Sequence, residues 1–338
     1  MTPQVVAIGS RPRFISVVPL VRSLGIIAVF LLICIVFAVW NEYFMTVDNW
    51  RNLLRQSSIN AILAIGVTFV ILAGGIDLSV GSVMAVCGMV AASLVTSSTL
   101  HAGWLAGSIP AGSILQSVGV AATVGVLVGA ALGSVNGLLV ARFGLPSFVA
   151  TLGMLSMARG LTLIYSDGRP IPNLSSDFRW LGGGDIAGVP VPVLILAIVF
   201  AVAHFAMKHT TWGRYIFAVG GSEKASRTSG VSTRLVSAST YAVCGALAGL
   251  AGLILTARTT AALPQAGVGY ELDAIAAVVI GGASLSGGRG SLVGTLFGAL
   301  IIGTINNGMD LIGVSSYYQQ LFKGLIIIIA VALDRARR

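Results

Sequence analysis

Long apolar runs, separated by short polar or glycine-rich stretches, dominate the pattern of hydrophobic and polar positions along this chain. A helix needs about 20 apolar residues to cross the hydrocarbon core of a bilayer. Charge-poor apolar runs occur at 24–40, 58–74, 80–96, 114–141, 147–165, 191–207, 236–257, 271–283, 291–308 and 318–333. They are too long and too uniformly apolar for the alternating strands of a membrane β-barrel. The pattern predicts an all-α, polytopic integral membrane protein with about ten transmembrane helices.

Composition supports lipid as the main solvent of the chain. Only 9% of its residues are charged and 56% are hydrophobic, whereas soluble domains carry about 25% charged residues. The 43 glycines fit as well, because small residues let membrane helices approach closely. Two sets of glycines recur at helical spacing, namely Gly125, Gly129, Gly133 and Gly137, and Gly245, Gly249 and Gly252. We expect both sets to form close helix contacts.

The net charge of +9 does not indicate nucleic-acid binding, because basic residues flank the apolar runs instead of forming one binding face. Basic residues collect on the cytoplasmic side of membrane proteins. An internal N-terminus places these there: Arg11, Arg13, Arg22, Arg142, Lys208, Arg214, Lys224, Arg227, Arg234, Arg289, Arg335, Arg337 and Arg338. The first apolar run lacks a small-residue cleavage site, which favours an uncleaved span over a signal peptide. We expect cytoplasmic tails at 1–23 and 334–338 around a membrane domain at 24–333, in the cytoplasmic (inner) membrane of a bacterium.

The longest internal connection, 208–235, differs from the other connections. It is basic, and Ser222 followed by Glu223, Lys224 and Ala225 forms a helix-start pattern that Gly230 closes. A short cytoplasmic helix is therefore predicted. It serves either as a plain anchoring loop or as a docking surface for a cytoplasmic partner. The longest external connection, 166–190, is rich in glycine and proline and is predicted to be a turn-rich surface loop.

A glycine-rich segment recurs between apolar runs. At a constant offset of 207 residues the matches are Gly74/Gly281, Gly75/Gly282, Leu78/Leu285, Ser79/Ser286 and Gly81/Gly288. Transporters often contain internal repeats with broken helices at corresponding positions. Chance matching of two glycine-rich segments is the alternative. The recurrence predicts two breaks in membrane helices, with the symmetry of the repeat left open.

Polar residues inside the apolar runs need a reason, because buried charge is costly in lipid. Asp77 lies in the first break, where it either caps the following helix or lines a polar pathway. The intramembrane amides of Asn136, Asn306 and Asn307 either bridge helices or bind solute hydroxyls. Arg159 must reach an acid, a carbonyl or water. Lys323 is expected to snorkel. The candidate pathway or broken-helix residues are Gly74, Gly75, Asp77, Ser79, Asn136, Gly281, Gly282, Ser286, Asn306 and Asn307.

Motifs of enzymes are absent from the sequence. There is no G-x-x-x-x-G-K-[ST] phosphate-binding loop, and the three histidines have no metal-ligand spacing. Gly288, Gly290 and Gly294 resemble a dinucleotide fingerprint, but they lie between apolar runs and not in a strand–helix unit. The chain is therefore expected to be a transport subunit without a cofactor of its own.

Four segments carry a resemblance to a known family. They are AIGVTFVILAGGIDLSVGSVMA at 64–85, GRYIFAVGGSEKASRTSGV at 213–231, GYELDAIAAVVIGGASLSGGRGSLVGTLFGALIIG at 269–303 and NNGMDLIGVSSYYQQLFKGLIIIIAV at 306–331. Together they resemble the permeases of monosaccharide ABC importers, most closely those of the ribose type. The resemblance covers roughly residues 50–333.

The resemblance implies a transport machine with several subunits. Two permease copies, expected to form a homodimer, would form the pathway, a cytoplasmic ATPase holding ATP and magnesium would drive it, and a periplasmic sugar-binding protein would deliver a ribose-like pentose. The ATPase would meet the 208–235 loop, with Gly221, Glu223, Lys224, Arg227 and Gly230 as the expected coupling residues. Movement of this loop would then alternate access to a weakly polar cavity.

Two alternatives remain from the sequence. An ion-coupled secondary sugar transporter would need intramembrane carboxylates, of which Asp77 is the one central candidate. A permease of the same kind could also carry a signalling sugar or a branched-chain amino acid. An integral membrane enzyme is a distant third reading.

Overall fold

The structure is a computed structural model that describes residues 17–96 and 117–336. Most of the predicted tail 1–23, the end of the predicted tail 334–338 and nearly all of the external segment 97–117 lie outside these residues. Every predicted apolar run coincides with a helix. These helices are α1 Val17–Trp40, α2 Val47–Leu72, α3 Val80–Val95, α4 Val118–Ala141, α5 Ser147–Ser166, α7 Val191–His209, α10 Thr233–Thr259, α11 Tyr270–Ile280, α12 Leu292–Leu311 and α13 Ser316–Ala336.

Length and composition divide these helices into two classes. Among the described residues six helices are long and apolar enough to cross a membrane, namely α2, α4, α5, α7, α10 and α12. The helix α3 has only 16 residues and α11 only 11, so ten is an approximate number of spans. The all-α, polytopic membrane architecture is confirmed.

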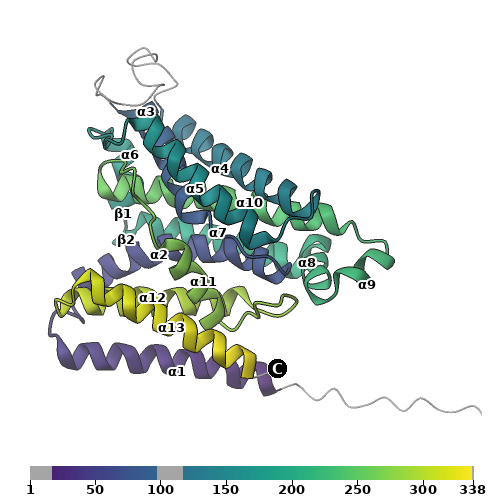
Figure 1. The fold of residues 1–338 in the computed structure, drawn as a ribbon. Helices are drawn as coiled ribbons and strands as arrows, with labels where there is room; N and C mark the ends of the chain where they lie inside the picture. The colour runs from purple at the N-terminus through teal and green to yellow at the C-terminus, as the bar shows by residue number, and fades with distance from the viewer. Residues whose placement is uncertain (1–16, 97–116, 337–338) are drawn as a thin grey trace, which may run out of the picture.

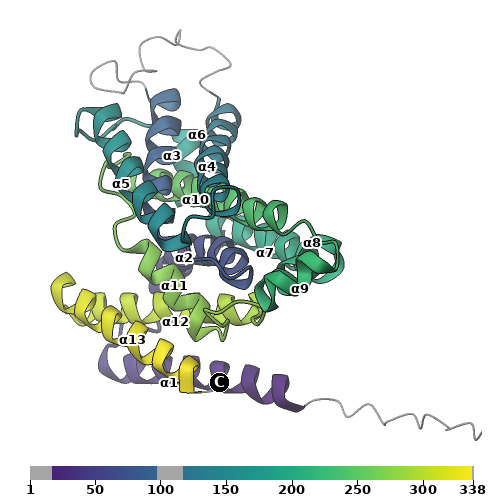
Figure 2. The ribbon, with the colours of Figure 1, turned by 45° about the vertical axis from the view of Figure 1, so that its right-hand side comes forward.

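Helix α2 lies at the centre of the molecule. Figures 1 and 2 place it between one group of helices, α3, α4, α5 and α10, and a second group, α1, α12 and α13. Its most apolar window is 83% buried by protein, whereas the windows of α4, α5 and α7 are 22–28% buried. The chain itself leaves much of the apolar surface of these outer helices uncovered, so lipid or another protein chain would cover it.

The two glycine sets form close helix contacts, as predicted; most of them meet in one seam between α4 and α10, while Gly252 packs against Met84 of α3. A Cβ atom at Gly129 would meet the carbonyl oxygen of Gly245, and one at Gly133 would meet that of Tyr241. From the other side, a Cβ at Gly249 would meet the carbonyl of Gly125. The backbones therefore approach so closely that only glycine fits between them.

Both long connections contain more regular structure than predicted. The 166–190 connection holds α6 Ser176–Gly183 and a hairpin of β1 Asp185–Ile186 and β2 Val189–Pro190. The turn-rich surface loop predicted there thus also contains short regular elements, because the apolar Phe178 is fully buried and packs α6 against α10. The 208–235 connection holds two helices, α8 Thr211–Gly221 and α9 Glu223–Thr228, where one was predicted.

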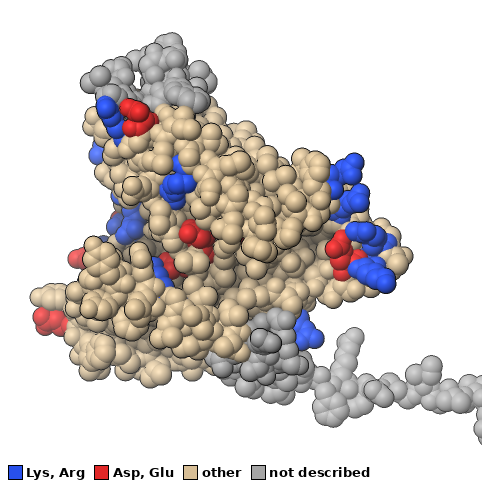
Figure 3. Space-filling view, viewed as in Figure 1, with Lys and Arg blue, Asp and Glu red and all other residues tan. Residues whose placement is uncertain are grey.

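These connections lie at opposite ends of the helix bundle (Figure 1). Helices α8 and α9 lie at the end where α1 begins and α13 ends, and α6 with the hairpin lies at the other end. Figure 3 shows Lys and Arg side chains gathered over α8 and α9, while the flank of the bundle is largely uncharged. The charge distribution thus marks the α8–α9 end as the basic end.

Candidate functional site

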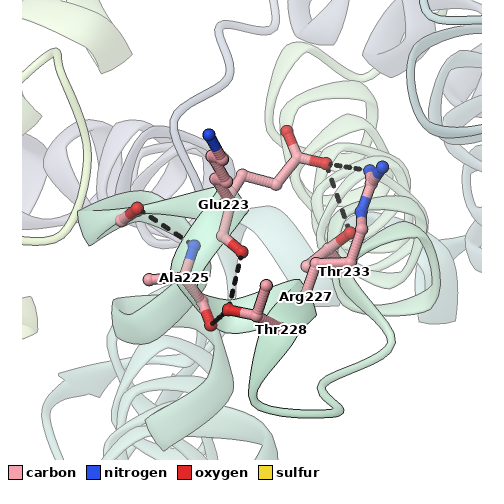
Figure 4. A network of polar contacts seen from close by, with 7 residues as sticks. Glu223, Ala225, Arg227, Thr228 and Thr233 are labelled. Carbon is pink, nitrogen blue, oxygen red and sulfur yellow. Dashed lines mark hydrogen bonds and ion pairs between the residues drawn. The ribbon is translucent and has the colours of Figure 1, made fainter.

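Helix α9 forms as its sequence predicts. The Ser222 hydroxyl accepts a hydrogen bond from the Ala225 amide at 3.2 Å, which satisfies one of the free N–H groups of the first turn. Glu223 Oε1 accepts hydrogen bonds from Arg227 Nη2 at 2.7 Å and from the Thr233 hydroxyl at 3.2 Å (Figure 4). Glu223 therefore joins α9 to the first turn of α10.

The surface of α9 is open to a partner. The side chains of Glu223 and Arg227 are each 61% exposed, and Lys224 is exposed as well. Gly221, also exposed, joins α8 to α9, and Gly230 ends the α9 turn with a φ of +83°. The predicted coupling residues thus lie together on one surface, which we call the platform and define as 211–230.

Gly220, which sequence reasoning did not single out, connects the platform to the membrane helices. A Cβ atom on Gly220 would meet the carbonyl oxygen of Leu72 and the amide of Gly288. The Leu72 carbonyl ends α2 directly before the first break, the Gly288 amide lies in the second break, and the two groups are hydrogen-bonded to each other at 2.9 Å. The platform therefore rests directly on the point where both breaks meet.

The first break, residues 73–79, is a buried polar network. Asp77 Oδ1 accepts hydrogen bonds from the Ser79 amide at 2.9 Å and the Ser79 hydroxyl at 2.6 Å. Asn136 Nδ2 on α4 donates to the same hydroxyl at 2.9 Å. Asp77 thus binds the residue just before α3, not an amide inside its first turn, and it faces protein in this conformation, with 1% exposure.

The second break comprises residues 281–291. Its backbone matches that of the first break at an offset that differs by one residue from the predicted offset. The left-handed glycine that ends the helix is Gly74 in the first break and Gly282 in the second, each with a φ of +88°. Gly281 instead has a helical φ of −62°. The offset of 207 residues was therefore wrong at the helix ends, where it is 208, because the sequence match followed glycine pairs and not the backbone. Ser286 is exposed and bonds to Ser284 within the turn.

The intramembrane amides bridge helices. Asn307 on α12 and Asn49 on α2 exchange two hydrogen bonds, at 2.9 and 3.0 Å. Asn306 donates to Asp273 Oδ2 on α11 at 3.3 Å. Both α12 amides are buried, so they connect three helices in this conformation.

Two basic residues inside the bundle find different partners. Lys323 on α13 pairs with Asp273 at 2.9 Å, so the expectation that Lys323 snorkels was wrong. The sequence carried no signal that joined these two residues, which are 50 positions apart. Arg159 donates to the carbonyl oxygens of Pro264 and Ala266, one of the partners expected for it.

A polar hollow opens beside the platform. Its volume is about 440 Å³. The first break and the α4–α5 connection form one side and the platform the other, with Gly74, Gly75, Arg142, Glu223, Arg227 and Arg234 among its lining residues. This hollow is large enough for a monosaccharide-sized solute, but its lining faces the basic end and not the middle of the bundle.

The described residues offer no metal centre. Among them no group of three or more His, Cys, Asp and Glu side chains converges, and Cys34, Cys87 and Cys244 are buried as free thiols. The chemistry available at the breaks and the platform is hydrogen bonding and charge, which suits binding and movement of elements.

Comparison with known proteins identifies the family. A family model described as "Branched-chain amino acid transport system / permease component" matches residues 49–331. The ribose import permease proteins of Haemophilus influenzae and Escherichia coli K12 are 47% and 44% identical, over 93% and 100% of both chains. The D-allose transport system permease protein of Escherichia coli K12 is 40% identical over 90% of both.

No solved structure matches the chain. The family match covers most of the chain, including both breaks, the platform and the buried amides. The chain therefore belongs to this family of permease components, which are multi-pass membrane subunits of ABC transporters without enzymatic activity of their own.

Proposed function

We propose that this chain is the permease of an ABC importer that carries ribose, or a closely similar monosaccharide, across the cytoplasmic membrane of a bacterium. The names of several relatives, two of them ribose import permeases at 44–47% identity, support this substrate class. The family description makes a branched-chain amino acid the second candidate. Sugar hydroxyls and an amino-acid zwitterion differ in charge, so competition experiments separate the two.

The observation that carries the proposal is the contact of the platform with both breaks. Gly220 at the end of α8 rests against the Leu72 carbonyl and the Gly288 amide. A force applied to the platform from the cytoplasm would therefore reach the ends of α2 and α11 through backbone contacts. A subunit without its own ATP site needs such a connection to an external ATPase.

The partners follow from this mechanism. A separate ATPase, which holds ATP and magnesium, docks on the platform. It contacts Gly221, Glu223, Lys224, Arg227 and Gly230. A periplasmic sugar-binding protein docks at the opposite end, near α6. A second copy of the chain completes the pathway as a homodimer, and both termini lie on the cytoplasmic side with the platform.

Reconstitution in liposomes with the ATPase and the binding protein tests the proposal. We expect ATP-dependent uptake of labelled ribose that excess allose reduces and excess leucine does not. Uptake driven by an ion gradient without the ATPase would contradict it and favour a secondary transporter. Uptake of leucine instead of ribose would overturn the substrate class.

Charge reversal of Glu223 tests the platform. We expect Glu223→Lys to lower ribose uptake per ATP hydrolysed while the protein still inserts and folds. Glu42→Lys, an equal charge change in the exposed turn after α1, is the matched control and should keep normal uptake per ATP hydrolysed. Because Glu223 and Arg227 form an ion pair, the swap Glu223→Arg with Arg227→Glu should restore the pair but not the coupling. Normal coupling in Glu223→Lys would refute the placement of the ATPase.

A further inference from the structure

Two charged residues lie within the helical flank of the bundle, away from both of its ends. Arg159 is on α5, twelve residues after the helix begins and seven before it ends, and Glu271 is in the first turn of α11. Figure 3 shows acidic and basic atoms on this otherwise uncharged face, over α5 and α11. Charges at this depth are costly against lipid. The face therefore meets water or protein in the working transporter.

The Arg159 guanidinium is fixed by backbone. Its Nη1 donates to the carbonyl oxygens of Pro264 at 2.7 Å and Ala266 at 2.9 Å. The side chain is only partly buried. A guanidinium carries five N–H donors, and within the described part of the chain Nε and Nη2 have no hydrogen-bond acceptor. Arg159 thus holds the 260–269 segment with one nitrogen and has donors left for a ligand.

Glu271 is fixed in a similar way on the other side. Its Oε1 accepts a hydrogen bond from the Gly269 amide at 3.2 Å, and its Oε2 lies against Gly81 at the start of α3. Arg159 bonds to the Ala266 carbonyl and Glu271 to the Gly269 amide, so both side chains bind the same short segment, yet no ion pair joins them among the residues described. The two opposite charges are therefore held near each other without neutralising each other directly.

Gln265 lies between the two residues whose carbonyls hold Arg159, and it is exposed. Its amide both donates and accepts hydrogen bonds. A donor fork, a carboxylate acceptor and an amide are the groups that bind neighbouring hydroxyls of a polyol. The Lys323–Asp273 pair nearby differs, because its charges are joined at 2.9 Å and bound by Asn306, so it holds helices together.

We propose that Arg159, Gln265 and Glu271 form a subsite for sugar hydroxyls on the face of α5, the 260–269 segment and α11. This inference rests on the proposed function and specifies where the sugar passes through the membrane domain. Arg159 donates to one hydroxyl, Glu271 accepts from another, and Gln265 orients the ring at the entrance. The second permease copy covers the face and encloses the sugar.

Uptake by the reconstituted importer tests the role of Glu271. We expect Glu271→Gln to lower ribose uptake roughly ten- to hundredfold, the effect of losing a hydrogen bond to a charged group. ATP hydrolysis stimulated by the loaded binding protein should stay within about twofold, because docking and coupling are untouched. Arg159→Lys keeps the positive charge but loses the forked set of guanidinium donors. It should likewise lower ribose uptake while ATP hydrolysis stays nearly unchanged. Glu42→Gln, a neutralised carboxylate that is exposed in the turn after α1, should leave both unchanged.

Thiol labelling gives a second test at an exposed position. Gln265→Cys should react with a thiol reagent in the assembled importer, against little background, because the three native cysteines are buried. Ribose-loaded binding protein with a non-hydrolysable ATP analogue should slow this labelling at least about threefold by placing sugar over the thiol. Glu42→Cys, exposed in the turn after α1, should label at the same rate with and without sugar.

The outcomes separate the two proposals. If the unaltered protein takes up no sugar, the proposed function fails before the variants matter. If it takes up ribose while Glu271→Gln and Arg159→Lys retain normal uptake, the subsite is wrong and the importer stands. Equal labelling of Gln265→Cys with and without ribose would likewise overturn the subsite.

Discussion

The two glycine-rich breaks begin with the same turn and then differ in what holds them. In each, a left-handed glycine ends a helix, Gly74 after α2 and Gly282 after α11. In each, the amide of this glycine donates to the carbonyl three residues back, and the next amide donates to the carbonyl five residues back. This arrangement satisfies carbonyls that the helix end leaves free.

Beyond that turn, side chains from other helices hold the first break. The Ile76 amide donates to the Ser147 hydroxyl at 3.2 Å, and the Thr151 hydroxyl donates to the Ile76 carbonyl at 3.3 Å. Asn136 reaches Ser79 from α4. The first break is therefore a junction of α3, α4 and α5.

The second break folds mainly on itself. The Ser284 amide donates to the Arg289 carbonyl at 2.9 Å, and the Gly287 amide donates to the Ser284 carbonyl at 3.0 Å. Its hydrogen bond to α2 comes from the backbone amide of Gly288. A repeated sequence thus supplies a repeated helix end, while neighbouring residues decide whether the break joins helices or forms a compact turn.

The largest effect is expected where both breaks meet the platform. Gly220→Val should prevent correct assembly, because even a Cβ atom there would meet the Leu72 carbonyl and the Gly288 amide. We expect most of the variant to be lost as aggregate in size-exclusion chromatography after detergent extraction. Gly221→Val is the matched control, since no described atom lies within 4 Å of a Cβ at Gly221. Equal recovery of both variants would show that the junction is loose.

A smaller loss is expected from Gly75→Ala, which gives the first break the residue that the second break has at the equivalent position, Ala283. A Cβ on Gly75 would meet the Tyr241 hydroxyl, so the substitution should lower the free energy of unfolding by about 1–3 kcal/mol. The reverse change, Ala283→Gly, should cost about 1 kcal/mol, because it removes one methyl group and adds backbone freedom. Thermal unfolding midpoints in detergent measure both. If Ala283→Gly lowers the free energy of unfolding more than Gly75→Ala does, the second break, and not the first, is the more tightly packed.

Asp77→Ala should have a similar or slightly smaller effect. It leaves the Ser79 amide and hydroxyl without the carboxylate that accepts from both, at a cost of about 1–3 kcal/mol. Asp77→Asn retains an acceptor oxygen and should recover at least half of that loss, as measured by the same unfolding midpoints. If Asp77→Asn destabilises the protein as much as Asp77→Ala, the charge of Asp77 matters more than its hydrogen bonds.

The sequence predicts the membrane helices well because one physical property, apolar length, determines them. It also predicts that both glycine sets form close helix contacts, since glycines four residues apart lie on one helix face, but it does not predict that α4 and α10 meet each other. The short helix α9 follows from Ser222 and Gly230, which are local start and stop signals. In each case the information lies within one turn or one helix.

What the sequence could not predict depends on contacts between distant segments. The pairing of Lys323 with Asp273 and the contact of Gly220 with Leu72 and Gly288 join residues that no local pattern relates. The register error at Gly281 has the same origin, because glycine pairs match by letter while the left-handed conformation selects one of them. The roles of the predicted coupling and pathway residues stay predictions, since the structure shows their positions and not their partners.

The smallest effect is expected from Ser286→Ala in the second break. Ser286 is exposed, and its hydroxyl bonds only to Ser284 in the same turn, so the free energy of unfolding should change by no more than about 0.5 kcal/mol. The backbone bonds of the turn, from Ser284 to Arg289 and from Gly287 to Ser284, do not involve that hydroxyl. Ser79→Ala, the match of Ser286 in the sequence repeat, removes a buried hydroxyl bound to Asp77 and Asn136 and should cost several times more. If both variants lower the free energy of unfolding equally, side-chain hydrogen bonds stabilise both breaks. A turn stabilised by backbone hydrogen bonds alone would not be destabilised by the loss of a hydroxyl.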